Sequence, residues 1–98
     1  MNFFDFTIPQ QGETFSTLLN HPKVKIVRIV SSDELGEKEY VQEEDEWVLL
    51  LEGEAKLLLN RKEVTLKKGD SLFIPALIPH QVLSAQMGTL WIALHIYI

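Results

Sequence analysis

Few side chains in this 98-residue sequence are suited to catalysis or ligand binding. There are three histidines, His21, His80 and His95, and no cysteine, which excludes a thiolate zinc site, a cysteine nucleophile and a disulfide framework. A metal ion would therefore bind through nitrogen and oxygen atoms. Glu46 and His80 are a carboxylate and an imidazole that could act as general base and general acid, although many barrels contain such a pair. Phosphate loops and nucleophile elbows are absent.

Acidic side chains are concentrated in the middle of the chain. The formal net charge is −5, and residues 31–54 hold ten acidic side chains against Lys38 alone. Because clustered Lys and Arg are missing, we expect neither nucleic acid nor a membrane as a partner. Residues 43–45 are expected to form a solvated turn rather than a calcium loop, whose ligands alternate around a glycine. With no membrane-spanning run and no leader pattern, the expected location is cytoplasmic.

The elements that must position these side chains are mostly strands. A short helix is predicted from about Glu13 to Leu19, since Phe15, Leu18 and Leu19 have helical spacing before the His21-Pro22 break. Alternating and β-branched stretches predict strands after that point. Residues 39–42 and 46–51 are expected to form one hairpin through the acidic turn. The other strands are predicted at residues 23–30, 55–59, 63–66, 71–74, 80–84 and 89–97.

These short strands predict an all-β chain that forms an antiparallel barrel or sandwich. Residues 1–98 are expected to form a single domain, with an N-terminal segment at 1–22 and a β-barrel at 23–98. So short a chain has a thin core, and a partner subunit would add buried surface. We therefore expect a homodimer.

The spacing of several residues resembles the second motif of the cupin family, G-x5-P-x-G-x2-H-x3-N. Gly69, Pro75 and His80 occupy the glycine, proline and histidine positions, while Leu77 and Ser84 replace the second glycine and the asparagine. The resemblance covers roughly residues 36–97 and implies a cupin-type jelly-roll barrel. Because cupins include enzymes, storage proteins and sensing domains, the resemblance implies no substrate.

The first cupin motif, G-x5-H-x-H-x3/4-E-x6-G, is matched only in its second half. Glu46 and Gly53 stand at its glutamate and glycine, but the histidine pair is replaced by Tyr40 and Gln42, or by Glu39 and Val41 if the gap has four residues. A group of small bacterial cupins is similar over residues 40–50 and also has glutamine here. The structural positions of the two motifs are Gly53, Gly69 and Pro75, where tight turns and a loop are expected.

The resemblance and the strand pattern together imply a polar site at the barrel mouth. Tyr40 and Gln42 are two apart and share one face of a strand, the hairpin returns Glu46 beside them, and the barrel brings His80 to the same place. Gln42, Glu46 and His80, with His95 as a fourth ligand, could hold a divalent Zn, Fe, Mn or Ni ion. The alternative is a polar interior in which these side chains bond to one another without a metal.

Two principal functions follow from this site. The first is a metal-dependent enzyme acting on a small polar metabolite, in which Tyr40 orients the substrate and His95 is a ligand or proton carrier. The alternative is a non-catalytic barrel that binds or senses a small-molecule ligand without a tightly bound metal, which the missing histidine pair favours. A third possibility is a purely structural homodimeric barrel. Trp47 and Trp91 are expected to pack in the core or a dimer interface.

Overall fold

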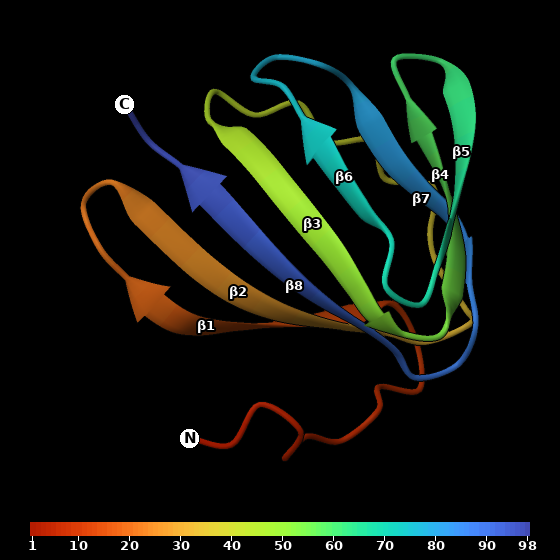
Figure 1. Cartoon of the computed structure of the whole chain (residues 1–98). Coiled ribbons are helices and arrows are strands. Elements are labelled where there is room, and N and C mark those ends of the chain that lie inside the picture. Colours follow the sequence, from red (N-terminus) through yellow and green to blue (C-terminus); the bar gives the residue numbers. More distant parts are fainter.

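The computed structural model describes all 98 residues and contains eight strands and no helix. A five-stranded sheet has the order β1-β2-β8-β3-β6, and a three-stranded sheet has the order β5-β4-β7 (Figure 1). Every strand pair in both sheets is antiparallel. The all-β prediction is confirmed, and nothing in the chain is a helix able to cross a membrane. The strands are β1 Glu13–Asn20, β2 Val24–Ser31, β3 Asp45–Glu52, β4 Glu54–Leu59, β5 Lys62–Lys67, β6 Ser71–Ile74, β7 His80–Ala85 and β8 Thr89–Ile96.

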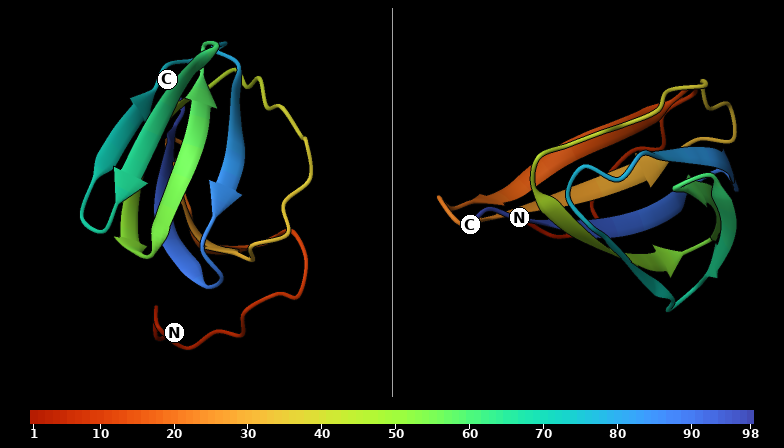
Figure 2. Two further views of the ribbon diagram at one scale, coloured as in Figure 1. Left: turned by 90° about the vertical axis from the view of Figure 1, so that its right-hand side faces the viewer. Right: turned by 90° about the horizontal axis from the view of Figure 1, so that it is seen from above.

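The two sheets face each other as the walls of a barrel, as the view from above in Figure 2 shows. Alternation along β3 turns Glu46, Val48 and Leu50 inward, and all three are buried. This is the period-two pattern of a strand with one face on a core. The core unites both sheets and consists of Val48, Leu50, Ala55, Leu57, Leu66, Ile74, Trp91 and Ala93.

The seven strands predicted after Pro22, apart from residues 39–42, are confirmed to within about two residues at each end. Gly53 lies in the turn between β3 and β4, at a position that only glycine can occupy without strain. Its φ is +95°, and an added Cβ would collide with the side chain and backbone of Thr89. Gly69 has a φ of +90° with open space around it, so there the requirement is backbone conformation alone. Pro75 follows β6 directly and begins the loop to β7.

The short helix predicted from Glu13 to Leu19 is wrong, because these residues form β1. The strand pairs antiparallel with β2, and a bulge at Leu18 shifts the register between Thr17 and Leu19. A seven-residue helix is marginally stable on its own, whereas β1 gains a full ladder of hydrogen bonds to β2. Because of the extra residue at the bulge, Phe15, Leu18 and Leu19 do not follow the period-two pattern of a regular strand, and their spacing resembled that of a helix.

The predicted hairpin of residues 39–42 with residues 46–51 is also wrong. β3 pairs with β6 on one side and β8 on the other, so it has no free edge for a further strand. Tyr40 instead forms an isolated bridge with His80, in which each backbone N–H donates to the other residue's carbonyl at 2.8 and 3.0 Å. The segment between β2 and β3 therefore runs past the edge of β7 (Figure 2).

The N-terminal residues lie against the outside of the large sheet, where Arg28 of β2 holds them. The Arg28 Nη1 group donates to the carbonyls of Phe3 and Asp5 at 3.0 and 3.1 Å. Its guanidinium also lies 5.5 Å from the centre of the Phe6 ring. Arg28 is buried, and this segment accounts for its burial.

Candidate functional site

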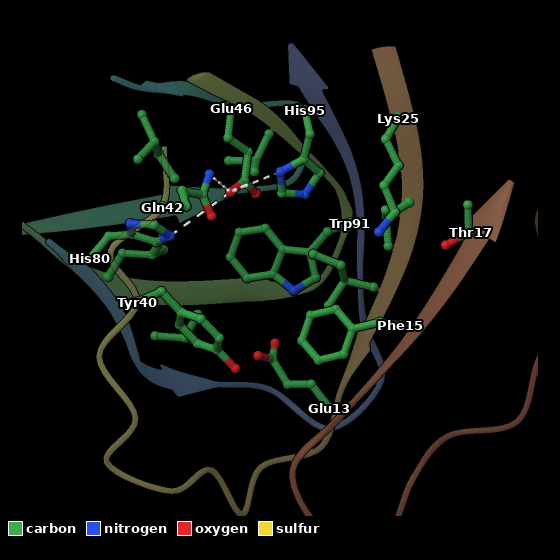
Figure 3. A pocket seen from close by; sticks show the side chains of 16 residues that line it. Glu13, Phe15, Thr17, Lys25, Tyr40, Gln42, Glu46, His80, Trp91 and His95 are labelled. Atoms are coloured by element: carbon green, nitrogen blue, oxygen red, sulfur yellow. Dashed lines mark hydrogen bonds and ion pairs between the residues drawn. The ribbon is translucent and has the colours of Figure 1, made fainter. Parts of the chain in front are cut away.

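A cavity of about 250 Å³ opens between the two sheets beside the core. Inward positions of successive strands supply its walls (Figure 3). β1 and β2 supply alternate residues, as expected for strands with one face on the interior. Its lining residues are Glu13, Phe15, Thr17, Lys25, Val27, Ile29, Tyr40, Gln42, Glu46, Val48, Leu57, Ile74, His80, Val82, Trp91 and His95.

Glu46 is the centre of the polar end of this pocket. Its carboxylate is buried with 6% exposure, and Gln42 Nε2 donates a hydrogen bond of 2.9 Å to Oε1. His80 Nε2 lies 3.8 Å and His95 Nδ1 lies 3.9 Å from the same oxygen. The structure therefore brings together all four residues proposed from the sequence as ligands.

Hydrogen bonding fixes the orientation of His80. Its Nδ1 lies 3.1 Å from the backbone oxygen of Ile78, which can only accept a hydrogen bond. Nδ1 therefore carries the proton, and in the neutral ring Nε2 presents its lone pair towards Glu46 and the pocket. The ring of Tyr40 is stacked on that of His80, with centroids 5.9 Å apart.

Glu44 belongs to the site as well, which the sequence did not predict. Its Oε2 lies 2.9 Å from His95 Nδ1, and both side chains are only 17% exposed. The expectation that residues 43–45 form a solvated turn is wrong for two of the three, since Asp45 Oδ1 also accepts a hydrogen bond from the backbone of Ala76. Only Glu43 is exposed.

Glu13 is a second carboxylate in the pocket, placed there by the strand that was predicted as a helix. Its Oε2 accepts a hydrogen bond from Ser31 Oγ, which in turn accepts one of 2.9 Å from Trp91 Nε1. Burial raises the pKa of Glu13 above its ordinary value, the charge of Glu46 raises the pKa further, and the Ser31 hydrogen bond lowers it. The period-two series of Glu13, Phe15 and Thr17 was the sequence signal that could have revealed this wall.

Tyr40 lies on the same side of the pocket as Glu13 (Figure 3). Burial raises the pKa of the Tyr40 phenol, and the negative charge of Glu13 raises it further. The phenol therefore keeps its proton at neutral pH and can donate a hydrogen bond to a bound molecule. His21, by contrast, lies exposed between β1 and β2, and its Nδ1 accepts a hydrogen bond from the backbone of Lys23.

The ring nitrogens nearest Glu46 are spaced more widely than the ligands of one metal ion. Two ligands of one metal ion at about 2.1 Å lie roughly 3.0–3.4 Å apart, whereas both imidazole nitrogens are farther than that from Glu46 Oε1. The His95 nitrogen nearest Glu46 is occupied by Glu44, and Gln42 turns its amide nitrogen to Glu46. No group of three or more His, Asp or Glu side chains has the geometry to hold a metal ion. His80 and His95 both use Nδ1 to donate a hydrogen bond, to the Ile78 carbonyl and to the Glu44 carboxylate, which leaves Nε2 of each ring free, as in many metal-binding histidines.

The chain is similar in sequence and in structure to known proteins of one family. A family model described as Cupin domain matches residues 26–92. A search of curated proteins found no match to the chain. A structure from Ralstonia eutropha JMP134, provisionally named a mannose-6-phosphate isomerase, is 29% identical with a TM-score of 0.86. That alignment covers 100% of this chain and 97% of the other.

Two more distant structures share the fold. An RmlC-like cupin from Shewanella frigidimarina NCIMB 400 is 18% identical with a TM-score of 0.78, over 98% of this chain and 91% of the other. HppE in its Fe(II) form is 21% identical with a TM-score of 0.76, over 86% of this chain and 50% of the other. Such low identity supports the fold and not a shared activity.

Proposed function

Since this chain belongs to the cupin family and has its jelly-roll fold, we propose that its barrel binds a small organic molecule in the pocket without a resident metal ion. The observation that carries the proposal is a cavity with an apolar wall and one polar end, centred on Glu46. Small-molecule sites have this composition, in which apolar surface supplies affinity and a few polar groups fix orientation.

The apolar wall and the polar end of the pocket would contact different parts of a ligand. Val27, Ile29 and Leu57 come from both sheets and can cover the apolar body of a ligand. His80 Nε2 and Glu46 face the cavity as acceptors, so a donor group on the ligand would pair with them. With a bound molecule at this end, the two groups can also exchange a proton with it.

The alternative function is a metal-dependent enzyme acting on a small polar metabolite. The orientation of His80, whose Nδ1 is bonded to a carbonyl so that Nε2 faces the pocket, favours it. The spacing of the donors opposes it, because the His95 nitrogen that lies 3.9 Å from Glu46 is the one bonded to Glu44, and His80 Nε2 lies 3.8 Å from Glu46. Measurement of metal content therefore separates the two functions.

A sugar-phosphate isomerase activity, which the name of the Ralstonia protein suggests, agrees poorly with this pocket. Lys25 is the one lysine or arginine among the lining residues, and Glu13 and Glu46 line the same cavity. Two carboxylates would repel a phosphate dianion more than one lysine attracts it.

Thermal shifts test the binding proposal. Protein treated with EDTA is screened against small amines, alcohols, carboxylic acids and sugars, and at least one class is expected to raise Tm in a concentration-dependent way. Glu46→Gln and His80→Phe should weaken that binding about tenfold or more, because each removes one acceptor and keeps the shape. His21→Phe changes an exposed histidine outside the pocket and should bind as the wild type does. The absence of any shift, or equal binding by all four proteins, would contradict the proposal.

A further inference from the structure

The two carboxylates of the pocket each leave one oxygen without a protein partner. Glu46 accepts from Gln42 at Oε1, and no protein donor reaches its Oε2. Glu13 accepts from Ser31 at Oε2, and no protein donor reaches its Oε1. Because both residues line the same cavity, these free oxygens are available to a bound molecule.

The imidazoles add acceptors rather than donors. His80 donates through Nδ1 to the Ile78 carbonyl, and His95 donates through Nδ1 to Glu44, so each neutral ring has its lone pair on Nε2. His80 directs that lone pair towards Glu46. A ligand at this end therefore meets acceptors on several sides.

Donors in the pocket are fewer. Lys25 is a pure donor, whereas the hydroxyls of Tyr40 and Thr17 can donate or accept. Two carboxylates against one lysine leave the pocket with a net negative charge when the imidazoles are neutral. The charge of Glu46 acts on Glu13, so the two carboxylates repel each other across the cavity. A positive charge between them would relieve this repulsion.

We propose that the ligand of this pocket carries a protonated amino group that binds at the polar end around Glu46, with the charge of Glu13 in the same cavity adding to the attraction, while its apolar body lies against the pocket wall. An ammonium group has three donors and no acceptor, which complements the free oxygens and the His80 lone pair. The rings of Phe15 and Trp91 line the same cavity (Figure 3), and aromatic surface is favourable to organic cations. The inference rests on the proposed function of the pocket as a small-molecule site.

Three test compounds of one shape distinguish the charge preference. Cyclohexylamine is a cation at pH 7, cyclohexanol is neutral and cyclohexanecarboxylate is an anion. Each is titrated into ¹⁵N-labelled protein, with the Trp91 indole N–H as the pocket reporter. We expect the amine to bind about tenfold tighter than the alcohol, and the carboxylate to bind most weakly.

Matched variants assign the preference to the two carboxylates. Glu46→Gln and Glu13→Gln each remove one charge with little change of shape, and each should reduce the ratio of amine to alcohol affinity. Glu63→Gln removes a charge from an exposed position on β5 and should leave the ratio unchanged. The dispersion of the amide spectrum shows that each variant is folded.

The other possible results show whether the amine preference alone fails or the proposed small-molecule function fails as well. Equal affinity for amine and alcohol, or tighter binding of the carboxylate, would overturn the charge preference and leave the small-molecule pocket intact. An amine preference that persists in both pocket variants would overturn the assignment to Glu46 and Glu13. Failure of all three compounds to bind would overturn the inference, and together with the absence of any shift in the thermal screen it would overturn the proposed function as well.

Discussion

At the scale of single residues, the environment of each polar side chain decides its chemical role. Glu46 is buried and accepts a hydrogen bond of 2.9 Å from the Gln42 amide, which offsets part of the cost of burying its charge. Glu13 has only the Ser31 hydroxyl to offset its burial. Burial therefore makes the charged form of Glu13 costly to the folded protein.

The first prediction concerns Glu13 and pH. Its pKa is raised in the folded protein above the ordinary value of 4.5, so folding favours the protonated form. Well below pH 4.5 the Glu13 carboxyl is protonated in both the folded and the unfolded chain, and its burial then costs no stability. As the pH rises, the unfolded chain loses its proton first, and the stabilisation lost grows until the pH passes the raised pKa.

Glu13→Gln removes that cost while an amide oxygen still accepts from Ser31. We expect the variant to have a higher Tm than the wild type at pH 7 and an equal Tm near pH 4, measured by circular dichroism. Glu63→Gln, on the exposed face of β5, controls for loss of one surface charge. A Tm difference that is the same at both pH values would contradict the prediction.

At the scale of elements, most of the strands could be predicted from the sequence, but the way they pair could not. Strands bounded by clear turn residues, such as Ser71–Ile74, were predicted correctly. β1 was not, because its bulge at Leu18 breaks the alternation that marks a strand. Tyr40 was assigned to the wrong partner, since the sequence does not reveal that both edges of β3 are already paired.

Strand pairing also explains which residues of the site could be predicted and which could not. Gln42, Glu46, His80 and His95 were proposed from motif spacing and do converge in the pocket. Their role in binding a metal remains a hypothesis. The opposite wall was missed, because it depends on the pairing of β1 with β2, which brings residues far from both motifs to the cavity.

The second prediction concerns the hairpin of β4 and β5. Its two-residue turn has positive φ at both Asn60 and Arg61, 48° and 67°, as a type I′ turn requires. Arginine is strained there, and glycine is the favoured second residue. Arg61→Gly should raise the free energy of unfolding by about 0.5–1 kcal/mol in urea titration. Arg61→Ala keeps the strain and is the matched control, and a Gly variant no more stable than it would contradict the prediction.

At the scale of the whole molecule, the core and the pocket share residues. Val48, Leu57, Ile74 and Trp91 belong to the buried core and also line the cavity. A ligand that fills the cavity adds contacts to the core itself, so binding should be visible as stabilisation of the entire barrel. This coupling is why thermal shift is a suitable screen.

The third prediction concerns the N-terminal segment. Arg28 is the residue that ties it to the sheet, and Arg28 Nε has no hydrogen-bond partner of its own. Arg28→Met keeps the apolar stem and removes the donors to Phe3 and Asp5. We expect faster amide hydrogen exchange in residues 1–10 and unchanged exchange in β3 and β8.

Arg28→Lys is the matched control, because it keeps the charge but not the forked geometry, and it should give an intermediate result. Ligand binding should be unaffected in both variants, since Arg28 does not line the pocket. Slow exchange of residues 1–10 in Arg28→Met would show that other contacts hold the segment.

Metal content tests the central claim most directly, because a barrel that binds a small molecule without a resident metal is distinguished from a metal enzyme by this one number. The protein is purified without an affinity tag or chelator, alongside Glu46→Ala and His80→Ala, and Zn, Fe, Mn and Ni are measured by ICP-MS. We expect far less than one ion per chain in the wild type and no difference among the three proteins. About one ion per chain in the wild type, lost in both folded variants, would contradict the account.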